Sequence, residues 1–286
     1  MSKLKILLII ILTLAFIGLA IAIYFLFTDI KSKMPNILES KYDINIQEYK
    51  NRNIFTVSPK ESKQDKYILY FHGGAYMAEI TDYHWNFIEK LIENTSYSVI
   101  IPDYPLTPKN NYKNVFEMIE PLYKKIIEKV EPKNLIMMGD SAGGGMALAL
   151  EEKLGEEQIE LPNKLILISP WIDVTMKNTE IDKIQKYDTD LNKEALKVAG
   201  IAYAGKDGME SYLVNPIDGP VEKLKNVTIF TGTYDILNPD SKIFVEKAKE
   251  KGVNINLKEY DKKAHIWIVK NSECKEFNDL INEIIS

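Results

Sequence analysis

The 286-residue sequence contains few of the residues that build disulfides or metal sites. Its single cysteine, Cys274, excludes an internal disulfide and any cysteine-based metal cluster, although it does not fix the redox compartment. There are only three histidines, and no H-E-x-x-H pattern or comparable ligand spacing is present. We therefore expect a function that requires no metal and no other cofactor.

The sequence also lacks an internal repeat, a low-complexity tract and a large excess of charge of one sign. The formal net charge is -5, with lysines and acidic residues interspersed, so we expect no surface for nucleic acid. The composition of 45% hydrophobic and 27% charged residues is typical of one ordinary globular domain. The chain is long enough to bury a large core.

The longest hydrophobic run lies at the start of the chain. Ile6 to Phe27 contains no charged residue and is long enough to span a bilayer. The run continues past the cleavage-like Ala20-Ile21-Ala22, which favours a retained anchor over a cleaved signal peptide. Lysines flank both ends, so the charge bias for orientation is slight. We expect residues 1–29 to be a membrane anchor or uncleaved signal, and residues 30–286 to form a domain outside the cytoplasm.

Short hydrophobic strands alternate with amphipathic helices along the rest of the chain. Alternating residues at Tyr42 to Tyr49, with a partner at Asn53 to Val57, predict two strands at a sheet edge. Further strands are predicted near 66–71, 98–101, 134–140, 164–169, 227–231 and 255–260, and helices near 82–93, 115–130, 141–154, 241–251 and 276–285. This order predicts a mostly parallel sheet with helices on both faces.

One interval interrupts the alternation of strands and helices. From about 175 to 225 the chain is polar and contains tyrosines, with a helical pattern at Lys193 to Ala202 and turn residues at Asn215-Pro216. It is too long for a simple connection. Its position between two core strands places it over their carboxyl ends, where ligands bind in open α/β sheets. We therefore expect a small helical lid at about 175–225.

The most informative stretch runs from Asn134 to Leu150. There a hydrophobic strand meets Gly139-Asp140-Ser141-Ala142-Gly143, and an Ala/Leu-rich helical pattern follows. A tight turn between strand and helix lifts a serine hydroxyl clear of the sheet, and glycines allow neighbouring backbone to pass close by. The N–H groups at the start of the helix face the place where negative charge would develop. Ser141 is therefore a candidate nucleophile.

A serine nucleophile needs a base, and the candidates are His72, His84 and His265. His72 opens a glycine turn directly after a strand and is better placed to brace that turn. His84 lies in a helical pattern, where an ordinary packing or surface role is expected. His265 follows the last predicted strand in a loop, from which an imidazole can reach over the sheet edge. Its pairing with Ser141 makes it the candidate base.

The third group must be a carboxylate that orients the imidazole and stabilises its cation. Asp235 qualifies because it ends a predicted strand. Asp240 lies at the start of a helix, where an acid has a capping role, and Asp261 lies close before the histidine in sequence. With Asp235 chosen, the chain order Ser, Asp, His is the order of one hydrolase architecture and differs from two other well-known serine triads.

Five separated motifs in the chain resemble motifs of a single protein family. They are His72-Gly73-Gly74-Ala75, Asp103-Tyr104-Pro105-Leu106-Thr107-Pro108, Gly139 to Gly144, Ser169 to Asp173, and Gly232 to Leu237. The first resembles an HGGG oxyanion motif, the second a DYRLAPE-like turn and the third a GDSAGG serine motif. Together they resemble the hormone-sensitive-lipase-like branch of the α/β-hydrolase superfamily, the carboxylesterase and lipase group. The resemblance covers roughly residues 66 to 270.

This resemblance implies an α/β-hydrolase fold with a mostly parallel eight-stranded sheet, in which Ser141, Asp235 and His265 match the family's catalytic triad. It also implies that the oxyanion donors are backbone N–H groups, for which the matching residues are Gly74, Ala75 and Ala142. Ala75 replaces the third glycine of the HGGG motif. The N–H group survives that change, but the added methyl group is expected to narrow the acyl side of the pocket.

The expected activity is hydrolysis of short to medium acyl esters through an acyl-enzyme. The expected partners are a small-molecule ester or lipid substrate and, through the N-terminal helix, a membrane. Tyr76, Met77, Trp171 and Tyr234 lie beside motif residues and are candidate substrate contacts, although aromatic residues at strand ends are commonly part of the core. Tyr76 is the one that we assign to substrate binding. The sequence does not indicate the natural substrate or the oligomeric state.

Other functions use the same residues. A peptidase, or a deacetylase acting on sugars or cell-wall polymers, would have the same triad and differ in the lid. A ligand-binding protein on a hydrolase scaffold is a third alternative, because fold does not fix function. Such proteins tend to lose a triad member, and this chain retains all three.

Overall fold

The computed structural model describes residues 31–61 and 64–286. The expected anchor at Ile6 to Phe27 therefore lies outside the described residues. Within the two described ranges, none of the helices combines the length and the apolar character that crossing a membrane requires.

One eight-stranded sheet, in the order β1-β2-β4-β3-β5-β6-β7-β8, forms the centre of the fold. The strands are β1 (Tyr42–Tyr49), β2 (Arg52–Pro59), β3 (Tyr67–Phe71), β4 (Ser98–Pro102), β5 (Leu135–Asp140), β6 (Lys164–Ile168), β7 (Val227–Gly232) and β8 (Ile255–Tyr260). β2 runs antiparallel to both of its neighbours, β1 and β4, and all other pairs are parallel. The expected mostly parallel eight-stranded sheet, with the strands near Tyr42 to Tyr49 and Asn53 to Val57 paired at its edge, is confirmed.

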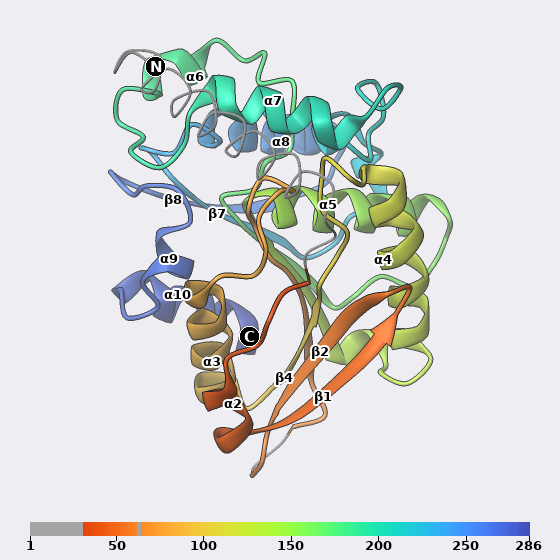
Figure 1. The fold of residues 1–286 in the computed structure, drawn as a ribbon. Helices are drawn as coiled ribbons and strands as arrows, with labels where there is room; N and C mark the ends of the chain where they lie inside the picture. The colour runs from red at the N-terminus through yellow and green to blue at the C-terminus, as the bar shows by residue number, and fades with distance from the viewer. Residues whose placement is uncertain (1–30, 62–63) are drawn as a thin grey trace, which may run out of the picture.

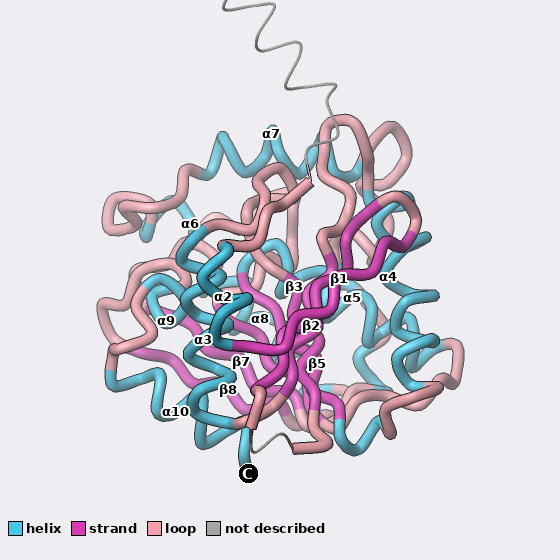
Figure 2. The backbone as a smooth tube through the Cα atoms, turned by 60° about the horizontal axis from the view of Figure 1, so that its bottom comes forward, coloured by secondary structure: helices cyan, strands magenta, loops and turns pink. Residues whose placement is uncertain are grey.

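The helices that surround the sheet are α2 (Asn36–Lys41), α3 (Asp82–Thr95), α4 (Tyr112–Ile127), α5 (Ser141–Glu156), α6 (Glu180–Ile184), α7 (Lys193–Ala204), α8 (Asn238–Glu250), α9 (Trp267–Lys270) and α10 (Lys275–Ile285). Figure 1 shows α3, α9 and α10 together on one side of the sheet and α4 and α5 on the other, and the turned view in Figure 2 agrees. The helices thus cover both faces, as the strand and helix alternation predicts.

Each face of the sheet packs on its own hydrophobic core, because successive side chains of a strand point to opposite faces. In β5, Met137 packs with residues of α4 and α5, whereas Ile136 and Met138 pack with residues of α3 and α10. Every residue of β5 is buried. This explains why the central strands are continuously hydrophobic and do not alternate with polar residues.

The segment between β6 and β7 contains α6, α7 and the short 3₁₀ helices Pro216–Asp218 and Val221–Lys223. The helical pattern predicted at Lys193 to Ala202 is confirmed as α7, which begins where the side chain of Asn192 accepts a hydrogen bond from the Ala195 N–H. Figure 1 shows α6 and α7 together at one end of the molecule. This segment leaves the carboxyl end of β6, so its helices lie at the edge of the sheet where Ser141 follows β5.

Several helix boundaries differ by a few residues from the sequence prediction, and two of these differences have a local cause. α8 begins at Asn238 rather than near residue 241, because Pro239 stands in its first turn, where the missing N–H costs no hydrogen bond. α4 ends at Ile127 rather than at residue 130, and the N–H groups of Lys129 and Val130 close the turn by bonding to the Ile126 carbonyl. Neither difference changes which face of the sheet the helix covers.

Candidate active site

The turn between β5 and α5 places Ser141 directly after the last residue of the strand. Its φ of 51° lies in the left-handed region, which is uncommon for a residue with a side chain and is concentrated at functional sites. The turn leaves no room for side chains nearby. A Cβ atom on Gly143 would lie 2.1 Å from the Phe71 carbonyl oxygen. The glycine at this position of the motif is therefore a steric requirement of the turn.

Ser141, His265 and Asp235 form a continuous hydrogen-bonded chain. His265 Nε2 lies 2.9 Å from Ser141 Oγ, and His265 Nδ1 lies 2.9 Å from Asp235 Oδ2. The three residues are buried, with exposed fractions of 5%, 3% and 0% respectively. Because a carboxylate only accepts, Nδ1–H donates to Asp235, and Nε2 is left to accept the serine proton. The structure thus brings together the three residues that the sequence predicts as a triad.

The surroundings of His265 favour its protonated form. Burial alone would lower the pKa of the imidazole, but the negative charge and hydrogen bond of Asp235 outweigh burial. The pKa of His265 is therefore raised above its ordinary value. The negative charge of Asp188 also raises the pKa of His265. A base in this environment can hold the proton that it removes from the serine.

Contacts between neighbouring loops hold the histidine and the aspartate in place. The Ile266 N–H donates to Ser169 Oγ at 3.1 Å, next to His265 in the chain. The Tyr234 N–H donates to the Lys263 carbonyl oxygen, which ties the loop after β7 to the loop after β8. Asp188 accepts the Ile236 N–H at 2.9 Å. Ser169 lies in one of the motifs that resemble the family, but the sequence gives it no role. Asp188 lies in the expected lid, where nothing in the local pattern distinguishes it.

The turn after β3 presents backbone N–H groups beside the serine. Gly74, Ala75 and Tyr76 have φ values of 118°, 53° and 60°, so three consecutive residues adopt left-handed backbone. In the described part of the chain, no protein acceptor takes the N–H groups of Gly74 and Ala75. The Ala142 N–H belongs to the first turn of α5, where N–H groups have no partner within the helix. These are the three donors that the resemblance implies.

His72 braces this turn, as the sequence predicts. Its Nδ1–H donates to the Gly73 carbonyl oxygen at 2.7 Å. The Tyr104 hydroxyl donates to the His72 carbonyl oxygen at 2.7 Å, and its ring stacks on the His72 ring. Burial is the main cause that lowers the pKa of His72, to about 3. The imidazole is therefore neutral at physiological pH and serves the turn as a fixed hydrogen-bond donor.

The candidate substrate contacts lie in different surroundings. Tyr76 is almost fully buried, and its ring lies parallel to the ring of Tyr203 in α7, with 3.5 Å between the ring centroids. The Trp171 ring also stacks on the Tyr76 ring, with 5.5 Å between the ring centroids, and is fully buried. Tyr234 stacks on Tyr187. Tyr76 thus links the oxyanion turn to α7, and its assignment to substrate binding stays a prediction.

The competing carboxylates, Asp240 and Asp261, do not contact the histidine. The capping role expected for Asp240 is wrong, because α8 has Leu237 at its N-cap position and no side-chain cap. Asp240 instead accepts a hydrogen bond from the Asn178 amide at 2.8 Å, and burial raises its pKa to about 6. Asp261 is exposed and accepts from the Thr233 hydroxyl. Of the three candidate carboxylates, Asp235 is the one that the structure places against His265.

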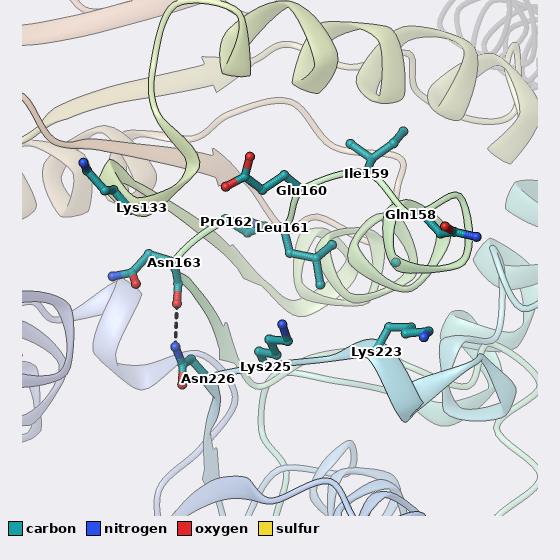
Figure 3. A pocket seen from close by; sticks show the side chains of 11 residues that line it. Lys133, Gln158, Ile159, Glu160, Leu161, Pro162, Asn163, Lys223, Lys225 and Asn226 are labelled. Atoms are coloured by element: carbon teal, nitrogen blue, oxygen red, sulfur yellow. Dashed lines mark hydrogen bonds between the residues drawn. The ribbon is translucent and has the colours of Figure 1, made fainter.

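A surface hollow shown in Figure 3 lies at the opposite edge of the sheet. Its lining includes Lys133, Asn163 and Asn226, which precede the amino ends of β5, β6 and β7. The Asn226 amide donates to the Asn163 carbonyl oxygen across it. No triad residue lines this hollow. Among the described residues there is also no group of three His, Cys, Asp or Glu side chains that could hold a metal ion.

Comparison with known proteins matches residues 68–269 to a family model described as the alpha/beta hydrolase fold. The match includes the serine turn, the oxyanion turn, Asp235 and His265. The chain belongs to this family. With the esterase described next, the match confirms the resemblance to the α/β-hydrolase superfamily and its carboxylesterase and lipase group.

Two relatives are named for hydrolysis of esters or acetyl groups. An esterase from Acinetobacter venetianus is 33% identical over 196 residues, which are 68% of this chain and 64% of the relative. An acetyl-hydrolase from Streptomyces hygroscopicus is 23% identical over 210 residues, which are 73% of this chain and 70% of the relative. The matched part thus spans less than two thirds of the length of the Acinetobacter esterase.

A solved structure from Staphylococcus aureus shares the fold over most of its length. It superposes with a TM-score of 0.82 at 29% sequence identity and covers 89% of this chain and 86% of that chain. The likeness therefore extends beyond the motifs to the whole sheet and its helices.

Proposed function

We propose that this protein is a serine carboxylic-ester hydrolase that acts through an acyl-enzyme. The observation that carries the proposal is the continuous hydrogen-bonded chain from Ser141 Oγ through His265 to Asp235, with 2.9 Å at each step. The esterase and acetyl-hydrolase among its relatives support ester bonds as the target. No cofactor takes part in the proposed reaction.

The proposed reaction begins when His265 Nε2 takes the proton of Ser141 and the serine oxygen attacks the ester carbonyl carbon. The oxyanion of the tetrahedral intermediate accepts hydrogen bonds from the N–H groups of Gly74, Ala75 and Ala142. The imidazolium, stabilised by Asp235, then donates its proton to the leaving alcohol. Water, deprotonated by the same imidazole, attacks the acyl-enzyme and releases the acid and the free serine.

Short to medium acyl chains are the proposed substrates. In this proposal the Ala75 methyl group narrows the space beside the oxyanion turn, and the stacked rings of Tyr76, Tyr203 and Trp171 limit the room for a longer acyl chain. Residues 175–225, which contain α6 and α7, act as the lid in this proposal. A peptidase or a sugar deacetylase would use the same residues, so the acyl and alcohol groups must be found by experiment.

The test is a panel of p-nitrophenyl esters of graded chain length, offered to the full chain in detergent. We expect hydrolysis that is fastest for short to medium acyl chains and is abolished in Ser141→Ala. Ser40→Ala, which changes an exposed serine in α2, should keep the activity of the unchanged chain. Near-normal turnover by Ser141→Ala, or no turnover of any ester by the folded protein, would refute the proposal.

We also propose that residues 1–29 anchor the protein in a membrane with the hydrolase domain outside the cytoplasm. The uninterrupted apolar run from Ile6 to Phe27 supports this. Such an anchor would hold the site near membrane glycerolipids or acylated cell-wall polymers. Protease treatment of intact cells should remove the domain, and a domain that is cleaved only after cell lysis would contradict the proposed orientation.

A further inference from the structure

His84 is fully buried at the start of α3, although the sequence assigns it no role beyond packing. Its Nδ1 accepts the Thr81 backbone N–H at 3.1 Å and lies 2.8 Å from the Thr81 hydroxyl. Because Nδ1 accepts a backbone N–H, the ring proton is on Nε2. The side chain therefore presents an N–H donor away from the start of its own helix.

That donor points at a buried carboxylate. His84 Nε2 lies 3.5 Å from Asp140 Oδ2, and among the described residues neither atom has another hydrogen-bond partner. The separation exceeds ordinary hydrogen-bond length, so the attraction is mainly electrostatic, and both side chains are fully buried, where screening by water is weak. The N–H group of His84 and this oxygen of Asp140 therefore interact with each other.

The other oxygen of Asp140 holds the oxyanion turn. Asp140 Oδ1 accepts the Gly73 N–H at 2.9 Å and the Tyr70 hydroxyl at 2.5 Å. A Cβ atom on Gly73 would lie 2.3 Å from Asp140 Oδ2 and 3.0 Å from Ser141 Cβ. The turn therefore packs directly on the aspartate and the serine, and its first N–H group is tied to the residue that precedes the nucleophile.

The ionised state of Asp140 depends on its partners. Burial alone would raise the pKa of this carboxyl, but His84 and the Tyr70 hydroxyl outweigh burial, and the pKa lies below its ordinary value. An ionised carboxylate accepts a hydrogen bond more strongly than a protonated one. Loss of His84 would weaken the hold of Asp140 on the Gly73 N–H.

We propose that His84 is a positioning residue for the oxyanion turn, acting through Asp140. Helix α3 fixes His84 through Thr81, His84 holds Asp140, and Asp140 holds Gly73 next to the donors of Gly74 and Ala75. The inference rests on the proposed ester hydrolysis for its catalytic consequence only. The coupling between His84 and the turn is a structural claim that can be measured without turnover.

Two substitutions separate this role from the role of His84 in starting the helix. His84→Asn can keep an acceptor near the Nδ1 position for the Thr81 N–H but cannot reach Asp140. His84→Gln places an amide N–H near the Nε2 position and cannot accept from Thr81 in the same way. Leu91→Ala, a fully buried residue of the same helix, reports what general damage to α3 does.

With a soluble p-nitrophenyl ester, His84→Asn should lower kcat about tenfold with little change in KM. That is less than the factor of about 10² to 10³ expected for outright loss of an oxyanion donor. Affinity for a trifluoromethyl ketone, whose tetrahedral adduct with Ser141 places an oxyanion in the same position, should fall in parallel. His84→Gln should recover most of kcat, whereas Leu91→Ala should lower Tm and leave kcat at low temperature near that of the unchanged chain.

Hydrogen exchange provides the readout that does not need turnover. In His84→Asn, amides of the peptide spanning residues 72–78 should exchange faster than in the unchanged protein, and in His84→Gln they should not. Unchanged exchange in His84→Asn, or equal losses of kcat in both His84 variants, would overturn the positioning role. Absence of ester turnover by the unchanged chain would overturn the proposed function. Hydrogen exchange would still test whether His84 positions the turn, because it does not depend on turnover.

Discussion

Three residues in the turns beside the serine have strained backbone. Ser141, Ala75 and Tyr76 all adopt left-handed backbone, at a cost on the order of 1–3 kcal/mol for each residue. All three belong to the two turns that meet at the candidate site. Such positions persist only where surrounding contacts hold them. In the turn after β3, His72 Nδ1–H donates to the Gly73 carbonyl oxygen and the Gly73 N–H donates to Asp140 Oδ1.

Some residues of the site can be recognised from the sequence and others cannot. Ser141 is recognisable because its motif has glycines at fixed spacing, and His265 because so few histidines compete. His84 is not recognisable, because its partner Asp140 lies 56 positions further along the chain and a histidine in a helix has no distinctive local pattern. Contacts between distant segments are set by the packing of the whole sheet, which a local pattern does not contain.

Replacing Asp235 tests how the carboxylate acts on the histidine. His265 must be neutral to act as base, and Asp235 raises its pKa, so activity should fall as pH drops through that raised value. Asp235→Asn should lower kcat by about 10⁴ and move the acid limb of the pH–rate profile to lower pH. Asp261→Asn, at an exposed carboxylate, is the control and should change neither quantity. An acid limb that stays in place in Asp235→Asn would show that another group controls the titration.

At the scale of elements, α5 is the most deeply buried helix of the site. It begins at Ser141 and is buried on nearly all sides, including Glu151 and Glu152. In the ranges that the structure describes, the four carboxylate oxygens of these two residues have no hydrogen-bond partner. Burial raises the pKa of both carboxyls well above the ordinary value. A sequence pattern of Glu-Glu-Lys suggests an exposed face, and the segment that buries it lies more than 60 residues later, around Gly219.

This burial predicts that the protein loses stability as pH rises. A carboxyl with a raised folded-state pKa binds its proton more tightly in the folded state, so the free energy of unfolding falls once pH exceeds the unfolded value near 4.5. The glutamine of Glu152→Gln cannot ionise, so this variant should have a higher Tm at pH 8. Each kcal/mol gained in the free energy of unfolding corresponds to a rise in Tm of about 2–4 °C. The gain should shrink toward pH 5. The control is Glu156→Gln, at an exposed position of the same helix, which should show no such pH-dependent gain. An equal Tm for Glu152→Gln and the unchanged chain at pH 8 would contradict the prediction.

At the scale of the whole molecule, the fold gathers the site along one edge of the sheet. The oxyanion turn follows β3, the serine follows β5, and Asp235 and His265 follow β7 and β8. Alternating strands and helices predict a mostly parallel sheet with two covered faces. The strand order does not follow from that alternation, because it depends on which distant segments pair in the folded chain. The anchor at residues 1–29 and the role of residues 175–225 as a lid remain predictions.

The central claim is that Ser141 carries the acyl group during turnover. The most direct measurement is mass spectrometry of the full chain quenched in acid during steady-state hydrolysis of a p-nitrophenyl ester, followed by peptide mapping. The account predicts an acyl adduct on the peptide that contains Ser141, and none in Ser141→Ala. Turnover with no adduct at Ser141, or with the acyl group on another residue, would contradict the account.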